Sequence, residues 1–195
     1  DILATYSTSI SKFNISASLG SNYRNEWSNN LNVNGTDSKV PNFYNISNYK
    51  NSYSSEAIYE KGVYSYYGLG SVSYGGFLYL DATLRNDNSS TLPKDNDSYW
   101  YHSENMSLLF SKLLGIESNI FNLGKIRGSY ARVGNDTSPY RTQAVYTIDQ
   151  TVTLPYTVAS IPSNLPDFDL RPETSDSWEI GTELGFFNNR LQLDF

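Results

Sequence analysis

The sequence predicts an all-β protein of antiparallel strands, and it favours the wall of a transmembrane β-barrel over a soluble β-sandwich. Three observations support this prediction. Apolar and polar residues alternate over several segments, aromatic residues make up 15% of a chain that is only 38% hydrophobic, and short turns alternate with long polar stretches. Because successive side chains of a strand point to opposite faces, each alternating segment has one apolar and one polar face.

The composition excludes several classes of protein. The net charge is −6 and no basic stripe occurs, which argues against a nucleic-acid partner. The sequence contains no cysteine, so neither disulfides nor thiolate sites are expected in it. No apolar run reaches the ~18 residues of a membrane-spanning helix, but the strands of a barrel cross a membrane without one. The 17 tyrosines suit strands that meet a membrane interface.

The first alternating segments are KFNISASLG and VYSYYGLGSVSY. In the former, one face carries Phe13, Ile15, Ala17 and Leu19, and the other carries Asn14, Ser16 and Ser18. In the latter, one face carries Tyr64, Tyr66, Gly68, Gly70, Val72 and Tyr74. Gly, Ser, Thr and Tyr are weak helix formers, so we predict strands for both segments. Glycines on an apolar face are unusual for a barrel and for a sandwich alike.

Later segments follow the same rule. In FLYLDATLRNDNSS, the apolar face carries Leu78, Leu80, Ala82 and Leu84, and the polar face carries Tyr79, Asp81, Thr83, Arg85 and Asp87. In SWEIGTELGF, one face carries Trp178, Ile180, Thr182, Leu184 and Phe186, and the other carries Glu179, Gly181 and Glu183. RLQLDF alternates similarly, with Leu191, Leu193 and Phe195 on one face.

The connections separate the two architectures. Short turns are predicted at Ser9–Lys12, Tyr74–Phe77 and Phe187–Arg190, and long polar loops at about residues 27–55, 86–97 and 134–174. The segment Ser111–Lys125 falls on the short side and is expected to include a helical stretch from Lys112 to Ile116. Short turns on one side and long loops on the other are typical of an outer-membrane barrel, whereas a Greek-key sandwich has no reason to alternate so regularly.

Strand length points the same way. Val63–Tyr74 and Phe77–Asp87 each run about a dozen residues. Strands of soluble sheets usually have ~5–6 residues, whereas a tilted membrane strand needs roughly 9–11. The pattern therefore favours the barrel and leaves the sandwich open.

Four segments resemble motifs of the SusC/RagA family of TonB-dependent outer-membrane transporters. LYLDATLRNDNSS resembles the family's strand ending in Arg–x–Asp–Gly–Ser–Ser, and its matching residues are Arg85, Asp87, Ser89 and Ser90, with Asn88 in place of glycine. YSYYGLGSVSYGGFLYL is similar to the hairpin before that motif. LGKIRGSYARVGND resembles the strand Leu–Lys–Leu–Arg–x–Ser–Tyr–Gly–x–x–Gly–Asn, with matches at Arg127, Ser129, Tyr130, Gly134 and Asn135. The segment from Leu165 resembles Asn–Pro–x–Leu–Lys–Pro–Glu and the hairpin after it, with matches at Leu170, Pro172, Glu173, Glu179, Gly181, Phe187, Asn189 and Arg190.

The resemblance implies that residues 1–195 are part of one TonB-dependent receptor β-barrel domain. Such barrels have about 22 strands around a plugged lumen, whereas we predict eight or nine here. The chain is therefore expected to be a slice of the C-terminal half of the barrel, without the plug domain, and its three long loops are expected to be extracellular.

The resemblance also implies the sidedness of the strands, since an arginine on the lipid face would cost roughly 2–4 kcal/mol at the midplane. The residues expected to face lipid are Leu78, Leu80, Leu84, Ile180 and Leu184. The polar residues expected to face the lumen are Asp81, Thr83, Arg85, Glu179 and Glu183.

The function implied by the resemblance is active import across the bacterial outer membrane. The family takes up an oligosaccharide or a peptide together with a SusD-like surface lipoprotein, and TonB acts through an N-terminal part that these residues do not contain. No catalytic activity and no cofactor are expected. The alternative is a soluble or surface-attached β-sandwich module that binds glycan without transport. A passive porin would share the barrel fold but lack a plug.

Candidate chemistry is sparse. His102 has no cysteine or tight carboxylate cluster beside it, so a structural role is expected. Glu179 and Glu183 lie roughly 13 Å apart by strand rise, too far for a glycosidase pair. The run Asp95–Ser98 is similar to a calcium loop but lacks its glycine and distal glutamate. The candidate ligand or partner contacts are loop aromatics interleaved with amides: Tyr23, Trp27, Phe43, Tyr44, Tyr49 and Tyr53.

Overall fold

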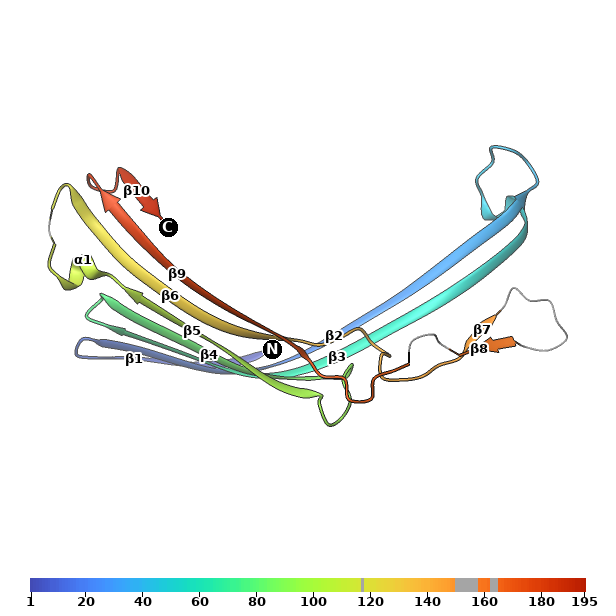
Figure 1. Cartoon of the computed structure of the whole chain (residues 1–195), viewed down its shortest axis with the longest axis horizontal. Coiled ribbons are helices and arrows are strands. Elements are labelled where there is room, and N and C mark those ends of the chain that lie inside the picture. Colours follow the sequence, from blue (N-terminus) through green and yellow to red (C-terminus); the bar gives the residue numbers. More distant parts are fainter. Residues whose placement is uncertain (117, 150–157, 162–164) are drawn as a thin grey trace.

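One curved antiparallel sheet dominates the computed structural model, which describes residues 1–116, 118–149, 158–161 and 165–195 (Figure 1). The sheet has eight strands in the order β1-β2-β3-β4-β5-β6-β9-β10. They are β1 (Ile2–Ile10), β2 (Phe13–Ser38), β3 (Tyr49–Tyr74), β4 (Leu78–Ser89), β5 (Ser98–Leu108), β6 (Phe121–Asn135), β9 (Glu173–Phe186) and β10 (Leu191–Asp194). The short strands β7 (Thr147–Asp149) and β8 (Val158–Ser160) form a separate pair.

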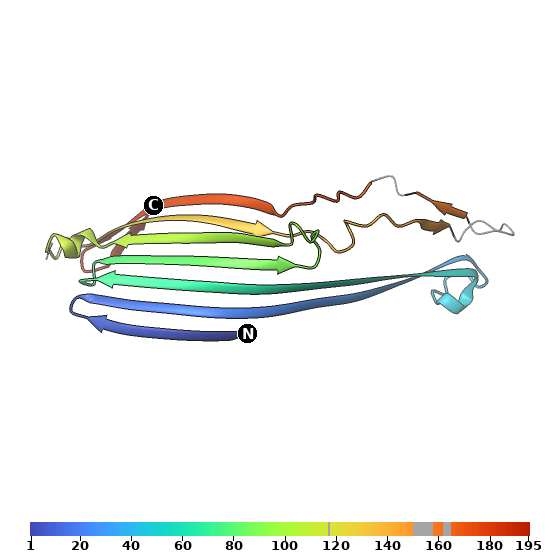
Figure 2. The same cartoon turned by 90° about the horizontal axis from the view of Figure 1, so that it is seen from below.

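The strands pair with their neighbours along the described chain, and they form a single layer (Figure 2). A β-sandwich would bury one face of this sheet against a second sheet. Within the described residues, the only buried apolar side chains are Val63 and Leu92. The structure therefore has the open arc of a barrel wall and not the sandwich that the sequence left as an alternative.

The tight connections lie together at one end of the strands, which we call the turn end (Figure 2). Gly75 and Gly76 have φ values of +60° and +68°, and Phe77 N donates to Tyr74 O, as in the type I′ turns that suit twisted hairpins. The helical stretch expected at Lys112–Ile116 is instead α1 (Phe110–Leu113), because the left-handed conformation of Gly115 ends the helix early.

The long connections lie at the opposite end of the strands, which we call the loop end. They are shorter than predicted. The loop expected at 27–55 is mostly strand: β2 and β3 stay in register from Phe13↔Tyr74 to Ser38↔Tyr49 and leave only residues 39–48, which contain the 3₁₀ turn η1 (Ile46–Asn48). Polar residues there resemble a loop in sequence, but backbone pairing satisfies their N–H and C=O groups.

The other two expected loops also lose residues to strands. The loop expected at 86–97 narrows to residues 90–97, because β4 continues to Ser89. The loop expected at 134–174 narrows to residues 136–172, and this connection carries β7 and β8. The elongated β2–β3 hairpin extends well beyond the neighbouring strands, and we call its part from residue 24 to residue 63 the hairpin arm (Figure 1).

The register continues the two faces of each strand across the whole sheet. One row of paired residues, for example, runs Ile15, Val72, Leu80, Met106, Gly128 and Ile180. The next residue along each strand gives a polar row of Ser16, Ser71, Asp81, Asn105, Ser129 and Glu179. Leu78, Leu80, Leu84, Ile180 and Leu184 all lie on the first, apolar face, and Asp81, Thr83, Arg85, Glu179 and Glu183 all lie on the second, polar face.

Candidate functional site

The polar face is a hydrogen-bonded surface of short side chains over its N-terminal half. Thr5 Oγ1 and Ser18 Oγ are 2.8 Å apart, and Thr83 Oγ1 and Ser103 Oγ are 2.7 Å apart. Each pair joins residues that face one another on neighbouring strands. Such cross-strand pairs stabilise the sheet, and they leave a smooth hydroxyl surface.

Charged residues of both signs gather on the polar face toward the turn end. Arg127 donates to both carboxylate oxygens of Asp194, at 2.7 and 3.1 Å, and Lys125 Nζ lies 3.4 Å from Glu183. A pocket of about 260 Å³ lies beside them. The side chains of the polar face that line it come from four strands: Asp81, Asn105, Ser107, Lys125, Arg127, Ser129 and Glu179.

One hydroxyl in this pocket has no partner. Ser107 Oγ is buried and makes no hydrogen bond within the described part of the chain. The arrangement can hold a ligand or another protein segment by hydrogen bonds and ion pairs.

A buried polar network occupies the loop end of the polar face. Asp87 accepts from Arg85 Nε at 2.7 Å and from the Tyr101 hydroxyl at 2.8 Å. The Arg85 guanidinium also donates to Ser65 Oγ at 2.8 Å, and Ser65 is only 1% exposed. Arg85 therefore joins β3 to β4 while Asp87 joins β4 to β5, which holds the loop ends of these strands together.

A second set of buried polar contacts at the loop end centres on Asp136, at the start of the 136–172 connection. Its carboxylate accepts from Lys61 Nζ and from Ser89 Oγ, and Ser90 Oγ accepts from the backbone N of Gly62 at 2.9 Å. The Arg–x–Asp and Gly–Asn segments that support the family resemblance thus meet in space. Lys61 and Asp136 were not among the predicted site residues, because nothing in the sequence pairs positions so far apart.

The six predicted loop aromatics do not form one cluster. Tyr23, Trp27, Tyr49 and Tyr53 belong to β2 and β3, so they are strand residues and not the loop residues expected. Tyr23 packs on Tyr64, with ring centroids 4.4 Å apart. Trp27 and Tyr53 are exposed along the hairpin arm.

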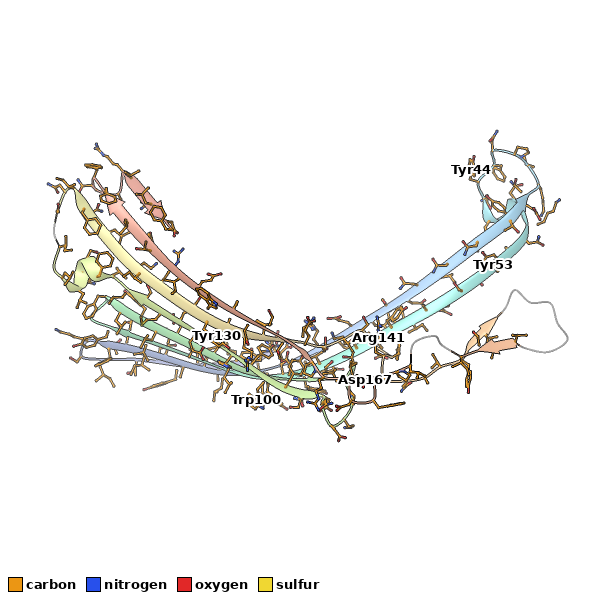
Figure 3. All side chains as sticks on the ribbon, viewed as in Figure 1. Tyr44, Tyr53, Trp100, Tyr130, Arg141 and Asp167 are labelled. Atoms are coloured by element: carbon orange, nitrogen blue, oxygen red, sulfur yellow. The ribbon has the colours of Figure 1, made fainter. Side chains whose placement is uncertain are left out.

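The remaining two aromatics lie at the tip of the hairpin arm. Asn48 orders this tip, since its side chain accepts from Val40 N at 3.0 Å and donates to the carbonyls of Val40 and Phe43 at 2.7 and 2.8 Å. Phe43 and Tyr44 remain exposed there, with Tyr44 86% exposed. Figure 3 shows Tyr44 at the tip and Tyr53 on the arm below it. The arm thus presents separated aromatic side chains over its length.

The 136–172 connection forms a second pocket, of about 300 Å³, that the sequence did not predict. Its lining includes Tyr140, Arg141, Gln143 and Asp167, and Figure 3 shows Arg141 and Asp167 just beyond the loop ends of β4, β5 and β6. The Tyr140 ring stacks on Tyr59 of the arm at 6.3 Å between centroids. The pocket offers both charges and an amide to a polar ligand.

Asp169 fastens this connection to the neighbouring one. Asn96 Nδ2 donates to Asp169 Oδ1 at 3.0 Å, and Arg171 Nη2 lies 3.1 Å from Asp169 Oδ2. The hydrogen bond from Asn96, together with the Arg171 guanidinium, lowers the pKa of Asp169 below its ordinary value. The carboxylate is therefore the form that holds the two connections together.

The described residues contain neither a cluster of metal-binding side chains nor a helix that could span a membrane. These residues contain no group of three or more side chains suited to hold a metal ion. In the run Asp95–Ser98, the first three residues end the 90–97 connection and Ser98 begins β5. His102 Nδ1 is 2.7 Å from Glu104 Oε1. None of the described helices is long and apolar enough to span a membrane.

Comparisons with known proteins agree on one family. A sequence profile described as "TonB dependent receptor-like, beta-barrel" matches residues 3–195. TonB-dependent receptor P3 of Formosa agariphila is 30% identical over 141 residues, which are 70% of this chain and 14% of that protein.

Solved structures described as RagAB share the fold. The RagAB peptide transporter matches 98% of this chain with a TM-score of 0.84 and 25% identity. The RagAB peptide importer matches with TM-scores of 0.83 in its "closed-closed" state and 0.79 in its "open-open" state, again at 25% identity. The chain spans 22% of the length of each of these structures.

Proposed function

Because this chain belongs to the TonB dependent receptor-like β-barrel family, we propose that it forms one arc of the barrel wall of an outer-membrane transporter that imports a peptide or an oligosaccharide. The family is one of receptors and transporters, not of enzymes. The likeness to RagAB agrees with the SusC/RagA resemblance of the four sequence motifs.

The observation that carries the proposal is the pair of faces, one mainly apolar and one polar, that the register continues from strand to strand across the sheet. On the apolar face the exposed side chains include Leu19, Leu84, Ile180 and Trp178. In water, so large an exposed apolar surface would be a liability, whereas in a bilayer it is the required outer surface of a barrel. We assign the apolar face to lipid and the polar face, with Asp81, Thr83, Arg85, Glu179 and Glu183, to the lumen.

The loop end then faces the outside of the cell. We assign the contact with a SusD-like surface lipoprotein to the hairpin arm, because its strands extend well beyond their neighbours and carry exposed aromatics, which are enriched in protein interfaces. TonB would act through a part of the protein other than these residues. The pocket with Arg141 and Asp167, at the lumenal mouth, is the proposed point of first contact with substrate.

The test is uptake by cells that carry the complete protein. Deletion of its gene, or of the gene for the lipoprotein partner, should abolish growth on a peptide or an oligosaccharide, and loss of TonB should have the same effect. Fractionation should place the protein in the outer membrane. Uptake that persists without TonB would identify a passive porin, and a soluble protein of about 22 kDa would refute the transporter.

A further inference from the structure

The apolar face contains a hollow of about 550 Å³ that spans four strands. Its floor is made of small residues, namely Gly70 of β3, Ala82 of β4 and Gly128 of β6. Its walls are Val72, Leu80, Met106, Tyr130 and Glu104. The register places all of these on the apolar face, in two adjacent rows.

The two glycines leave space that the fold of the described residues does not require. A Cβ at Gly70 would meet no atom within 4 Å, and a Cβ at Gly128 would meet only the Glu179 carbonyl oxygen, at 3.9 Å. Neither glycine has a positive φ. By contrast, a Cβ at Gly20 would lie 2.4 Å from the Tyr67 ring, so that glycine is needed for packing. The hollow is therefore suited to something that lies over the sheet.

Glu104 makes one wall of the hollow ionisable. It is paired with Ala82 on one side and Tyr130 on the other, and its carboxylate contacts His102 Nδ1 at 2.7 Å. The charged groups that β6 and β9 place on this face, Arg132 and Asp176, are already paired with each other at 2.7 Å. Ionisable residues on a membrane-exposed surface are rare and mark functional sites by default.

The hollow lies where a lipid headgroup and its chain would meet. Aromatic side chains mark the interface of a barrel. The register places Tyr130 and Trp178 beside Glu104 on the apolar face, and Trp100 just beyond it toward the loop end. Figure 3 labels Trp100 and Tyr130. From Glu104 the hollow continues toward the turn end between Leu80, Met106 and Gly128. A carboxylate at one end and an apolar channel behind it are complementary to an amphiphile whose headgroup carries an ammonium group.

We propose that the hollow binds a membrane lipid with a primary ammonium headgroup, which donates to the Glu104 carboxylate while one acyl chain lies over Gly70, Ala82 and Gly128. This site rests on the proposed assignment of the apolar face to lipid. It differs from the substrate pockets, which lie on the polar face and at its loop end. Small residues permit the close van der Waals packing that drives association inside a membrane.

The probe is palmitoyl-oleoyl phosphatidylethanolamine, with the matching phosphatidylcholine as the headgroup control that has no N–H donor. Native mass spectrometry of the complete protein in detergent would count the bound lipids. Wild type should bind phosphatidylethanolamine about tenfold more tightly than phosphatidylcholine, as expected for one charge-assisted hydrogen bond. Glu104→Gln should remove this preference.

Filling the hollow provides a second measurement. Gly70→Leu with Gly128→Leu should abolish the bound lipid, whereas Ala4→Leu, on the same face two strands away, should retain it. Heat-modifiable migration in gels would verify that each variant is folded.

Three results would overturn the site. They are equal binding of the two lipids by wild type, a retained lipid in the filled variant, or a change in the number of protein copies on filling, which would identify a second copy of the chain as the occupant. If the wild-type protein reaches the outer membrane and imports substrate, any of these results would refute the lipid site but not the proposed function. A protein absent from the outer membrane would overturn the proposed function as well.

Discussion

Asp136 is expected to hold the loop end of the sheet together, and its replacement by alanine should open that region. The Asp136 side chain is 6% exposed and accepts from Lys61, whose side chain is 17% exposed, and from the buried Ser89. Removal of one partner of a buried ion pair costs about 3–5 kcal/mol, because the other charge stays buried and unpaired. The flexible stem of Lys61 lets its ammonium reach water, which places the expected cost near the lower limit, ~3 kcal/mol.

This cost corresponds to a local opening constant about a hundredfold larger. Hydrogen–deuterium exchange of the complete protein would measure it at two amides, Ser89 N, which donates to Asp97 O, and Ser90 N, which donates to Gly62 O. Asp136→Asn keeps an acceptor for Ser89 and should have a smaller effect. As a control, Glu26→Gln breaks an exposed ion pair with Arg24. It should change the opening free energy of the amides around that pair by ~1 kcal/mol or less. Unchanged exchange at both amides in Asp136→Ala would refute the reasoning.

Three further predictions concern the faces, the connections and the arm. Ile180→Arg, on the apolar face, should destabilise the membrane-inserted barrel by ~2–4 kcal/mol in urea unfolding, whereas Ser177→Arg, on the polar face, should have little effect, and equal effects would contradict the assignment of faces. Because the pKa of Asp169 is lowered in the folded protein, the contribution of its carboxylate to stability is complete above the ordinary pKa of 3.8 and is lost as the pH falls through the lowered pKa. The amide hydrogen exchange of residues 90–97 should therefore differ between wild type and Asp169→Asn at pH 6. The two proteins should exchange alike once the pH is below the lowered pKa. Trp27→Ala should weaken lipoprotein binding roughly tenfold or more in a pull-down titration without affecting barrel assembly, and unaltered binding would remove the arm from the interface.

The sequence was most informative where residues alternate with a period of two. Leu78 to Asp87 showed both faces of β4 before any partner strand was known, and the turn at Gly75–Gly76 showed where the chain reverses. The arm was mistaken for a loop because Asn and Ser on both faces leave no hydrophobic pattern. Its strands are recognised only from the continuous pairing of β2 with β3.

The candidate site was less predictable. Arg85 and Asp87 were singled out from their motif, but their partners Ser65 and Tyr101 lie on other strands. The pocket containing Arg141 and Asp167 depends on how an irregular connection folds back on itself, which no local pattern encodes.

By itself, the sequence determined the fold class, the two faces of the strands that alternate clearly, such as β4 and β9, and the family, because a strand's alternation and a family's motifs are local along the chain. Only the tertiary structure decided which residues face one another across strands. It brought Lys61, Ser89 and Asp136 together, and it placed Gly70, Ala82 and Gly128 under one hollow beside Glu104. The physical reason is that register is set by hydrogen bonding between strands distant in sequence, and a shift of one residue would exchange every side chain between the faces.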